Sequence, residues 1–217
     1  MGWTNWRKAN YQFFEKWLWA RVTTQTLVDL GAGELQFGSL FKRFRYIGVD
    51  FQQFPGVEVI ADLTKRLPFS DHTADIVTLS NTLEHIPNTE HLLQECARVL
   101  KPGGLILGTI PFLLPVHQAP YDFNRYTNFQ LTKFLQDAGF HNVIVEPLGE
   151  QLDVYNTIEL KTFDELWKSR GGLLLRAIRL WRRLEMRLIL TLFHVPASDK
   201  VCEGYGFAGY TRQSNGK

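Results

Sequence analysis

Short, continuous apolar runs alternate with amphipathic segments along most of the chain. The runs carry few polar positions, which is typical of strands that are buried on both faces of a parallel sheet. Five of them follow one another at residues 26–30, 46–50, 57–61, 74–80 and 105–110, and a sixth lies at 142–146. The pattern predicts a largely parallel sheet whose strands are joined by helices.

Two of the connecting helices have clear ends. Apolar residues recur at helical spacing over 92–100, and the sequence KPGG at 101–104 ends that helix. A second helix begins after Thr127 with the Thr-x-x-Gln pattern of a capping box and ends at Gly139. Strands that alternate with helices of this length predict an α/β doubly wound fold with right-handed crossovers.

Both ends of the chain depart from this alternation. Residues 3–21 form a helical pattern rich in Trp and Phe, which we expect to belong to the core or to form a lid over a ligand site. Residues 203–213 are expected to return as a last, antiparallel strand. We expect one domain, made of an N-terminal aromatic helix (1–24), a ligand-binding core (25–150), a helical insertion (151–203) and the last strand with the tail (204–217).

The insertion contains an amphipathic segment at 171–195. Leucines and Trp181 fall on one helical face, and arginines fall on the opposite face; seven basic residues and one acid stand between Lys168 and Arg187. Two interpretations remain open. Residues 173–193 could lie in a membrane interface. Alternatively, the apolar face packs on the sheet or on a second subunit in a homodimer, and the arginines stand in water.

The turn after the first strand has the character of a nucleotide-binding turn. Asp29 precedes Gly31-Ala32-Gly33, which we expect to lead directly into the first helix, and glycines there let the backbone approach a ligand. Asp50 ends the next strand, where a carboxylate can accept hydrogen bonds from ribose hydroxyls. The dinucleotide fingerprint needs a third glycine where this chain has Gln36, so an NAD-dependent oxidoreductase is disfavoured.

Five motifs, taken together and in order, resemble those of class I S-adenosylmethionine-dependent methyltransferases of the small-molecule type. They are VDLGAG (28–33), GVD (48–50), ADLTKRLPF (61–69), DIVTLSNTLEH (75–85) and ARVLKPGG (97–104). The resemblance implies a seven-stranded, mostly parallel Rossmann-like methyltransferase fold with a C-terminal antiparallel strand. It also implies S-adenosylmethionine as the cofactor and S-adenosylhomocysteine as the product. The family usually has a glycine where this chain has Leu35, whose side chain would narrow the methionine end of the pocket.

The resemblance assigns cofactor-binding roles to residues at these strand ends. Asp29 would meet the amino group of the methionine part, and Asp50 would hold the ribose. The other residues are Gly31, Ala32 and Gly33 along the methionine, Phe51 beside the adenine, Asp62 and Leu63 at the adenine edge, and Ser80 and Asn81 under the methionine. Each aspartate could instead be a helix cap or a turn residue.

Candidate acceptor residues stand after the fourth and fifth strands. The loop 111–127 resembles a His…Pro-x-Asp-Phe-x-Arg-Tyr-Thr segment of related methyltransferases, among them ones encoded with polysaccharide and glycolipid genes. We predict His85, His117 and Asp122 as catalytic residues and Arg125 and Tyr126 as substrate-binding residues. Alternatively, Asp122 and Arg125 form an ion pair that holds the loop, Tyr126 belongs to the core, and His85 is an ordinary loop residue.

Composition narrows the remaining classes. The net charge of +2 gives no reason to expect a nucleic-acid partner, and no residues stand at metal-ligand spacing, so no metal is expected. Cys96 and Cys202 predict two free thiols in a reducing compartment. Neither a signal-type segment nor a membrane-spanning helix is expected.

The sequence therefore predicts a cytoplasmic methyltransferase that acts on a small or lipid-linked acceptor, with a sugar or glycolipid hydroxyl as the first candidate. A quinone-like hydrophobic acceptor is the second candidate. A third interpretation is a binding or scaffold protein that kept the fold and lost turnover.

Overall fold

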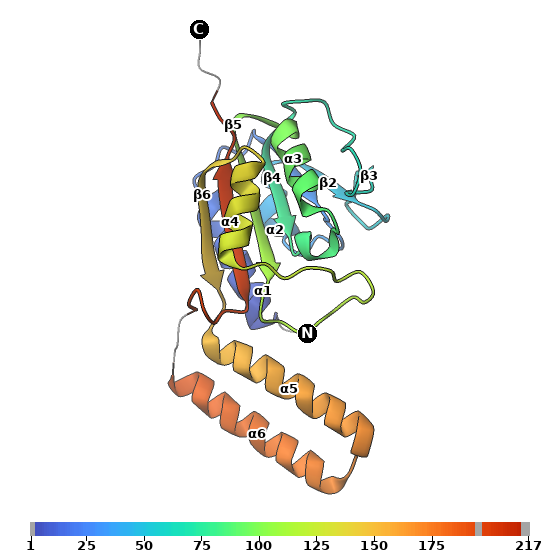
Figure 1. Cartoon of the computed structure of the whole chain (residues 1–217), viewed down its shortest axis with the longest axis vertical. Helices are drawn as coiled ribbons and strands as arrows, with labels where there is room; N and C mark the ends of the chain where they lie inside the picture. Colours follow the sequence, from blue (N-terminus) through green and yellow to red (C-terminus); the bar gives the residue numbers. More distant parts are fainter. Residues whose placement is uncertain (1–2, 194–196, 214–217) are drawn as a thin grey trace.

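The structure is a computed structural model that describes residues 3–193 and 197–213 of the 217-residue chain (Figure 1). Residues 194–196 of the amphipathic segment and 214–217 of the expected tail lie outside the described residues. The strands are β1 (Thr26–Leu30), β2 (Arg45–Asp50), β3 (Val59–Ile60), β4 (Ala74–Ser80), β5 (Leu100–Pro111), β6 (His141–Leu148) and β7 (Gly204–Tyr210). The helices are α1 (Asn5–Leu18), α2 (Gly38–Phe41), the short 3-10 helix η1 (Leu83–His85), α3 (Thr89–Val99), α4 (Asn128–Asp137), α5 (Gln151–Arg170) and α6 (Leu173–Leu192).

The strands form one seven-stranded sheet in the order β3-β2-β1-β4-β5-β7-β6. Neighbouring strands from β3 to β5 are parallel, and β7 runs antiparallel to both β5 and β6. The predicted mostly parallel sheet with a last antiparallel strand is confirmed. The strand order reverses between β1 and β4, and in such sheets ligands bind at this reversal, outside the carboxyl ends of the strands.

Helices cover both faces of the sheet (Figure 1). Leucines of α3 and α4 pack on one face together with residues of β4, β5 and β7. On the other face, Phe13 and Phe14 of α1 pack with Phe37 and Phe41 around α2 and with apolar side chains of β1 and β5. These phenylalanines are therefore core residues. Because helices cover both faces of the sheet, the strands bury side chains on each face. This explains why their sequences are continuous apolar runs.

Two predicted elements differ from the structure. The apolar run at 57–61 contributes only Val59 and Ile60 to the sheet, where β3 is an edge strand with a single neighbour. The turn after β1 does not lead directly into a helix, since α2 begins only at Gly38 and has four residues. Leu35 has a φ of 57°, which is outside the helical region, so a helix cannot begin at the glycines.

Helices α5 and α6 form an antiparallel hairpin that projects away from one end of the sheet (Figure 1). The start of α5 is attached to the domain, where the Asn5 side-chain amide donates to Asp153 over 2.8 Å. Farther out, arginines of α6 contact α5: Arg179 pairs with Asp164, Arg182 pairs with Glu159, and Arg176 lies over the ring of Trp167. The described arginines at the hairpin interface are thus paired and do not simply stand in water.

The apolar face of α6 is turned outward. Its exposed side chains are Leu173, Leu174, Ile178, Trp181, Leu184 and Leu188. The expectation that this face packs on the sheet is wrong for this chain, because the ion pairs with α5 turn the arginine-bearing side inward. No described helix is both long enough and apolar enough to cross a bilayer.

The packing of α1 predicts that Phe14→Ala destabilises the fold. Phe14 is 0% exposed, so its loss leaves a cavity, and we expect the free energy of unfolding to fall by about 3–5 kcal/mol in chemical denaturation. Phe129→Ala is the matched control, because Phe129 is 80% exposed and should change the same quantity by less than about 0.5 kcal/mol. Equal losses in the two variants would contradict the packing described here.

Candidate active site

The strands β1, β2 and β4 end side by side, and we call this side of the sheet the carboxyl edge. The turn after β1 is held there by backbone hydrogen bonds from Gly31 and Ala32 to the Val49 carbonyl oxygen, 2.9 and 3.0 Å long. The Asp50 carboxylate accepts from the Gly33 amide over 2.9 Å and from the Gln52 amide over 3.2 Å. The structure therefore brings Asp50 and the glycine turn together.

Asp29 lies in the interior at the end of β1. Its carboxylate accepts from the Thr78 hydroxyl over 2.7 Å and from the Tyr46 hydroxyl over 3.0 Å. Burial raises the pKa of Asp29 from 3.8 to about 6, although both hydrogen bonds act against this shift. Asp29 is thus a carboxylate whose charge changes close to neutral pH.

The glycine turn leaves open space beside its backbone. Gly33 has a φ of 49°, and nothing lies within 4 Å of the place where a Cβ atom would be. Leu35 also has positive φ, and its side chain packs on Gly56, where a Cβ atom would clash with it. These contacts place the Leu35 side chain on the side of the loop between β2 and β3. They do not support the expectation that Leu35 narrows the methionine end of the cofactor pocket.

The other predicted cofactor residues have mixed environments. Phe51 is exposed, and Leu63 is buried in the core. Asp62 is exposed and accepts from the Thr64 amide and hydroxyl, over 2.9 and 2.7 Å, as the turn interpretation describes. The buried hydroxyl oxygen of Ser80 has no hydrogen-bond partner among the described residues.

The N-terminal helix α1 reaches the carboxyl edge. The Trp6 indole N–H donates to the Asn81 side-chain oxygen over 3.1 Å, and the side-chain amide of Asn10 donates to the same oxygen over 3.5 Å. Trp3 lies edge-on to Phe37, with ring centroids 5.9 Å apart. The phenylalanines of this helix pack in the core as expected, Trp17 packs against the same core, and Trp6 contacts Asn81 at the carboxyl edge.

A second cluster forms where η1 meets the loop after β5. The Glu84 backbone oxygen accepts from the amides of Phe123 and Asn124, over 2.8 and 3.2 Å, and this holds the loop on η1. The Glu84 side chain is fully buried. Its Oε1 atom lies 3.8 Å from Nε2 of His85 and 3.8 Å from Nε2 of His117. We call Glu84, His85 and His117 the histidine–glutamate cluster.

Asp122 and Arg125 lie next to this cluster. Arg125 donates to both carboxylate oxygens of Asp122, over 2.6 and 2.8 Å, and the His117 amide donates to Asp122 over 2.8 Å. The ion pair of the alternative interpretation is thus present in the loop. The hydrogen bonds from Arg125 lower the pKa of Asp122 to about 2, so this group is a carboxylate at neutral pH.

The charge states of the cluster follow from burial. Burial raises the pKa of Glu84 to about 8 and lowers the pKa of His117.

Tyr126 lies apart from these groups. Its hydroxyl is 2.9 Å from the Thr89 hydroxyl, its ring is edge-on to Phe134, and it packs against the core. Tyr126 therefore has the environment that the core interpretation describes.

Comparison with known proteins shows which family the central part of the chain is similar to. Residues 14–108 match the methyltransferase domain family. The chain is 28% identical over 142 residues to a Mycobacterium tuberculosis protein named "Probable S-adenosylmethionine-dependent methyltransferase". The aligned segment covers 57% of this chain and 51% of that protein. It is also 43% identical over 51 residues to the demethylmenaquinone methyltransferase of Bacillus cytotoxicus, covering 24% of this chain and 22% of that protein.

Solved structures share the fold. A S-adenosylmethionine-dependent methyltransferase from Archaeoglobus fulgidus superposes with a TM-score of 0.61 at 18% identity, over 94% of each chain. Phosphoethanolamine N-methyltransferase 2 of Haemonchus contortus gives a TM-score of 0.60 at 16% identity, over 94% of this chain and 52% of that chain. Over residues 14–108 the chain is therefore similar to class I S-adenosylmethionine-dependent methyltransferases, and it shares their fold. It spans about half the length of the curated relatives that it matches first.

Sequence reasoning did not assign Asn10 to the carboxyl edge; it included Trp6 only in the aromatic helix and Glu84 only beside His85 at the end of the fourth strand. Trp6 and Asn10 meet Asn81 across more than seventy positions of sequence, and no local pattern indicates that contact. Glu84 has no sequence signal beyond its place beside His85. Its neighbour His117 comes from a different loop, so sequence spacing could not show the cluster. The roles of the predicted residues toward a ligand stay predictions.

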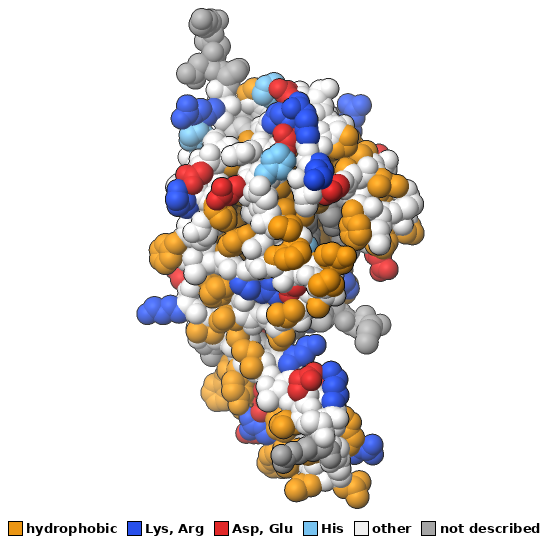
Figure 2. Space-filling model, turned by 45° about the vertical axis from the view of Figure 1, so that its right-hand side comes forward, with side chains coloured by type: hydrophobic (Ala, Val, Ile, Leu, Met, Phe, Trp, Pro, Cys, Tyr) orange, Lys and Arg blue, Asp and Glu red, His pale blue; other side chains and the backbone are white. Residues whose placement is uncertain are grey.

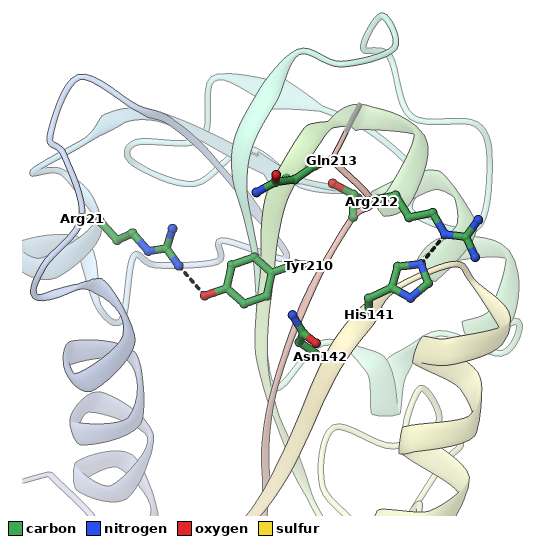
Figure 3. A pocket seen from close by; sticks show the side chains of 8 residues that line it. Arg21, His141, Asn142, Tyr210, Arg212 and Gln213 are labelled. Atoms are coloured by element: carbon green, nitrogen blue, oxygen red, sulfur yellow. Dashed lines mark hydrogen bonds between the residues drawn. The ribbon is translucent and has the colours of Figure 1, made fainter. Parts of the chain in front are cut away.

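A cavity lies at the opposite edge of the sheet (Figure 3). Its volume is about 570 Å³, and Arg21, Tyr210, His141 and Arg212 line it. Arg21 donates to the Tyr210 hydroxyl over 2.6 Å, and Arg212 donates to His141 over 2.7 Å. None of the predicted site residues lines this cavity, so it is separate from the carboxyl edge.

Proposed function

We propose that this protein binds S-adenosylmethionine at the carboxyl edge and transfers the methyl group to a small-molecule or lipid-linked acceptor. One observation carries the proposal: the open backbone of the glycine turn and the buried Asp50 carboxylate lie together on the ends of two neighbouring parallel strands. That arrangement is where a nucleoside binds in doubly wound folds.

The residues present fit this cofactor. Space beside Gly33 leaves room for a ligand against the backbone. Asp50 supplies a carboxylate for ribose hydroxyls, and Asp29 supplies one for an ammonium group. The unpartnered Ser80 hydroxyl lies at the end of β4 on the same edge. A related fold, that of the Haemonchus enzyme, was solved in complex with S-adenosyl-L-methionine.

S-adenosylmethionine supplies a methyl group that is already activated on a sulfonium. The protein therefore mainly aligns the acceptor and excludes water. Trp6 of α1 and the loop after β5 flank the carboxyl edge and can do both. A hydroxyl acceptor needs help in losing its proton, and the histidine–glutamate cluster stands at the same edge for that purpose.

Two acceptor classes follow from different observations. The loop with His117 and Arg125 resembles loops of methyltransferases encoded with polysaccharide and glycolipid genes, which favours a sugar or glycolipid hydroxyl. The short match to a demethylmenaquinone methyltransferase supports a quinone-like acceptor as the second candidate. Both acceptors are compatible with a cytoplasmic enzyme that works beside a membrane.

We also propose peripheral membrane contact through α6. Figure 2 shows hydrophobic and basic side chains gathered on the hairpin. Trp181 is 68% exposed on the outward apolar face, and Arg183 and Arg187 are exposed as well. Helices that lie in a membrane interface combine such an apolar face with basic residues.

Asp50→Ala should weaken cofactor binding. Loss of charged hydrogen bonds should raise the dissociation constant of S-adenosylhomocysteine, measured by calorimetry, about tenfold to a hundredfold. Asp137→Ala removes an exposed carboxylate on α4 and should leave the constant unchanged. Unchanged affinity in Asp50→Ala would refute the placement of the ribose. Failure of wild-type protein to bind either form of the cofactor at millimolar concentration would refute the function.

Affinity for S-adenosylhomocysteine should depend on pH through Asp29. Tyr46 and Asp50 of β2 and Thr78 of β4 surround this carboxyl, and its pKa is about 6. The ligand's ammonium group binds the ionised form, so affinity should rise from about pH 5 to about pH 7 and then level off. Calorimetry across this range should show the rise in wild-type protein. The Asp29→Asn variant should bind S-adenosylhomocysteine more weakly, and its affinity should not rise with pH. An identical rise in that variant would assign the pH dependence to another group.

Liposome flotation tests α6. Wild-type protein should float with anionic vesicles, and Trp181→Glu with Leu184→Glu should reduce the floating fraction severalfold, because charge on the apolar face opposes insertion. Phe129→Glu is the control, since it places the same charge on an exposed aromatic residue elsewhere. Wild-type protein that stays off anionic vesicles would defeat the proposal. A dimer in sedimentation that the double variant dissociates would instead assign the face to a second copy.

A further inference from the structure

The buried carboxylate of Glu84 lacks a partner. Its side chain has no exposed surface, and neither Oε1 nor Oε2 accepts a hydrogen bond from a described residue. Burying a carboxyl group in this way is costly unless it is paired or binds a metal ion. The two groups that approach Oε1 are the histidine nitrogens of the cluster, each 3.8 Å away. That distance is too long for a hydrogen bond.

Both histidines have their Nε2 atom on the side of Glu84. Nδ1 of His85 lies 2.6 Å from the Tyr121 carbonyl oxygen, and Nδ1 of His117 lies 3.3 Å from an Asp122 carboxylate oxygen. The Tyr121 carbonyl can only accept, so Nδ1 of a neutral His85 carries the hydrogen and its Nε2 keeps the lone pair; the Asp122 carboxylate beside Nδ1 of His117 favours the same tautomer there. Histidines that bind metals are oriented in this way, by a carbonyl or a carboxylate at the other ring nitrogen.

The three ligand atoms are close enough to share one ion. Nε2 of His85, Nε2 of His117 and a Glu84 oxygen all lie within 4.8 Å of one another. In a tetrahedral zinc site with bonds of about 2.1 Å, ligand atoms stand about 3.4 Å apart. Small side-chain rotations would bring these atoms to that separation.

The cluster is closed on one side and open on the other. Glu84 is 0% exposed, whereas the side chains of His85 and His117 are 19% and 38% exposed. An ion held there would keep a coordination position toward the solvent and the acceptor. Catalytic zinc sites have this character, with three protein ligands and one open position.

We propose that Glu84, His85 and His117 bind a divalent transition-metal ion of the zinc type. Two imidazoles and one carboxylate suit zinc, cobalt or iron(II) better than magnesium or calcium, which prefer oxygen ligands. This proposal replaces the expectation of no metal, which rested on spacing in the sequence. Asp122 would be a positioning residue, because it orients His117.

The ion's role in methyl transfer rests on the function proposed above. It would hold the acceptor hydroxyl and lower its pKa, as metal ions do for bound water. The hydroxyl proton leaves to water, the acceptor oxygen forms a bond to the methyl carbon, and the carbon–sulfur bond breaks. Its electron pair stays on sulfur, which becomes the neutral thioether of S-adenosylhomocysteine.

Equilibrium dialysis of the full chain against Zn²⁺, with metal content measured by mass spectrometry, tests the site. Wild-type protein should bind one equivalent, and Co²⁺ should give the visible absorption bands of a low-coordinate nitrogen and oxygen site. His117→Ala and Glu84→Gln should each weaken binding at least tenfold, and Asp122→Asn should weaken it about tenfold to a hundredfold. His141→Ala, in an exposed histidine at the opposite edge, is the matched control and should bind like wild type.

Metal affinity that stays unchanged in both His117→Ala and Glu84→Gln would overturn the proposal, as would a wild-type protein that binds no more metal than these variants. His117 stands in an exposed loop, so a circular dichroism melt that matches wild type separates lost binding from lost folding. Calorimetry with S-adenosylhomocysteine on the metal-free protein tests the cofactor site separately. Its failure would refute the proposed function and leave the metal result standing.

Discussion

One carboxylate, that of Asp50, joins two strand ends. By accepting the Gly33 amide it attaches the turn after β1 to the end of β2, and the backbone of that turn is fixed next to an open space. Because β1 and β2 are parallel neighbours, their ends meet at the same edge without further adjustment. The Val49 carbonyl oxygen holds the start of the turn, and the hydrogen bond to Asp50 fixes Gly33, which otherwise would have more conformations available.

The segment that leaves β4 connects the two halves of the site. The Thr82 hydroxyl donates to the Leu30 carbonyl oxygen over 2.9 Å and lies against Gly31, and two residues later Glu84 enters the histidine–glutamate cluster. The glycine turn and the cluster are therefore positioned by one short stretch of chain. A shift of η1 would move Glu84 toward or away from the histidines and would also disturb the turn.

Much of the sheet could be predicted from the sequence, because strands buried on both faces leave continuous apolar runs. The short α2 could not, since it depends on the positive φ of Leu35, a residue that seldom adopts that conformation. Of the candidate site, Asp50 and the glycine turn follow from their motifs. Contacts such as Trp6 with Asn81 and Glu84 with His117 join distant segments, and only the folded chain brings them together. The outward apolar face of α6 depends on ion pairs with α5, which the helical pattern of α6 alone does not contain.

The position of β7 in the sheet has a consequence for how the molecule is assembled. This strand lies between β5 and β6, although the long hairpin of α5 and α6 precedes it in the chain. As a ribosome makes the protein, β5 and β6 emerge well before β7, so β5 is then paired only with β4 and β6 has no strand partner among the described residues. The sheet becomes continuous only when the residues beyond the hairpin have been synthesised and have inserted into this gap.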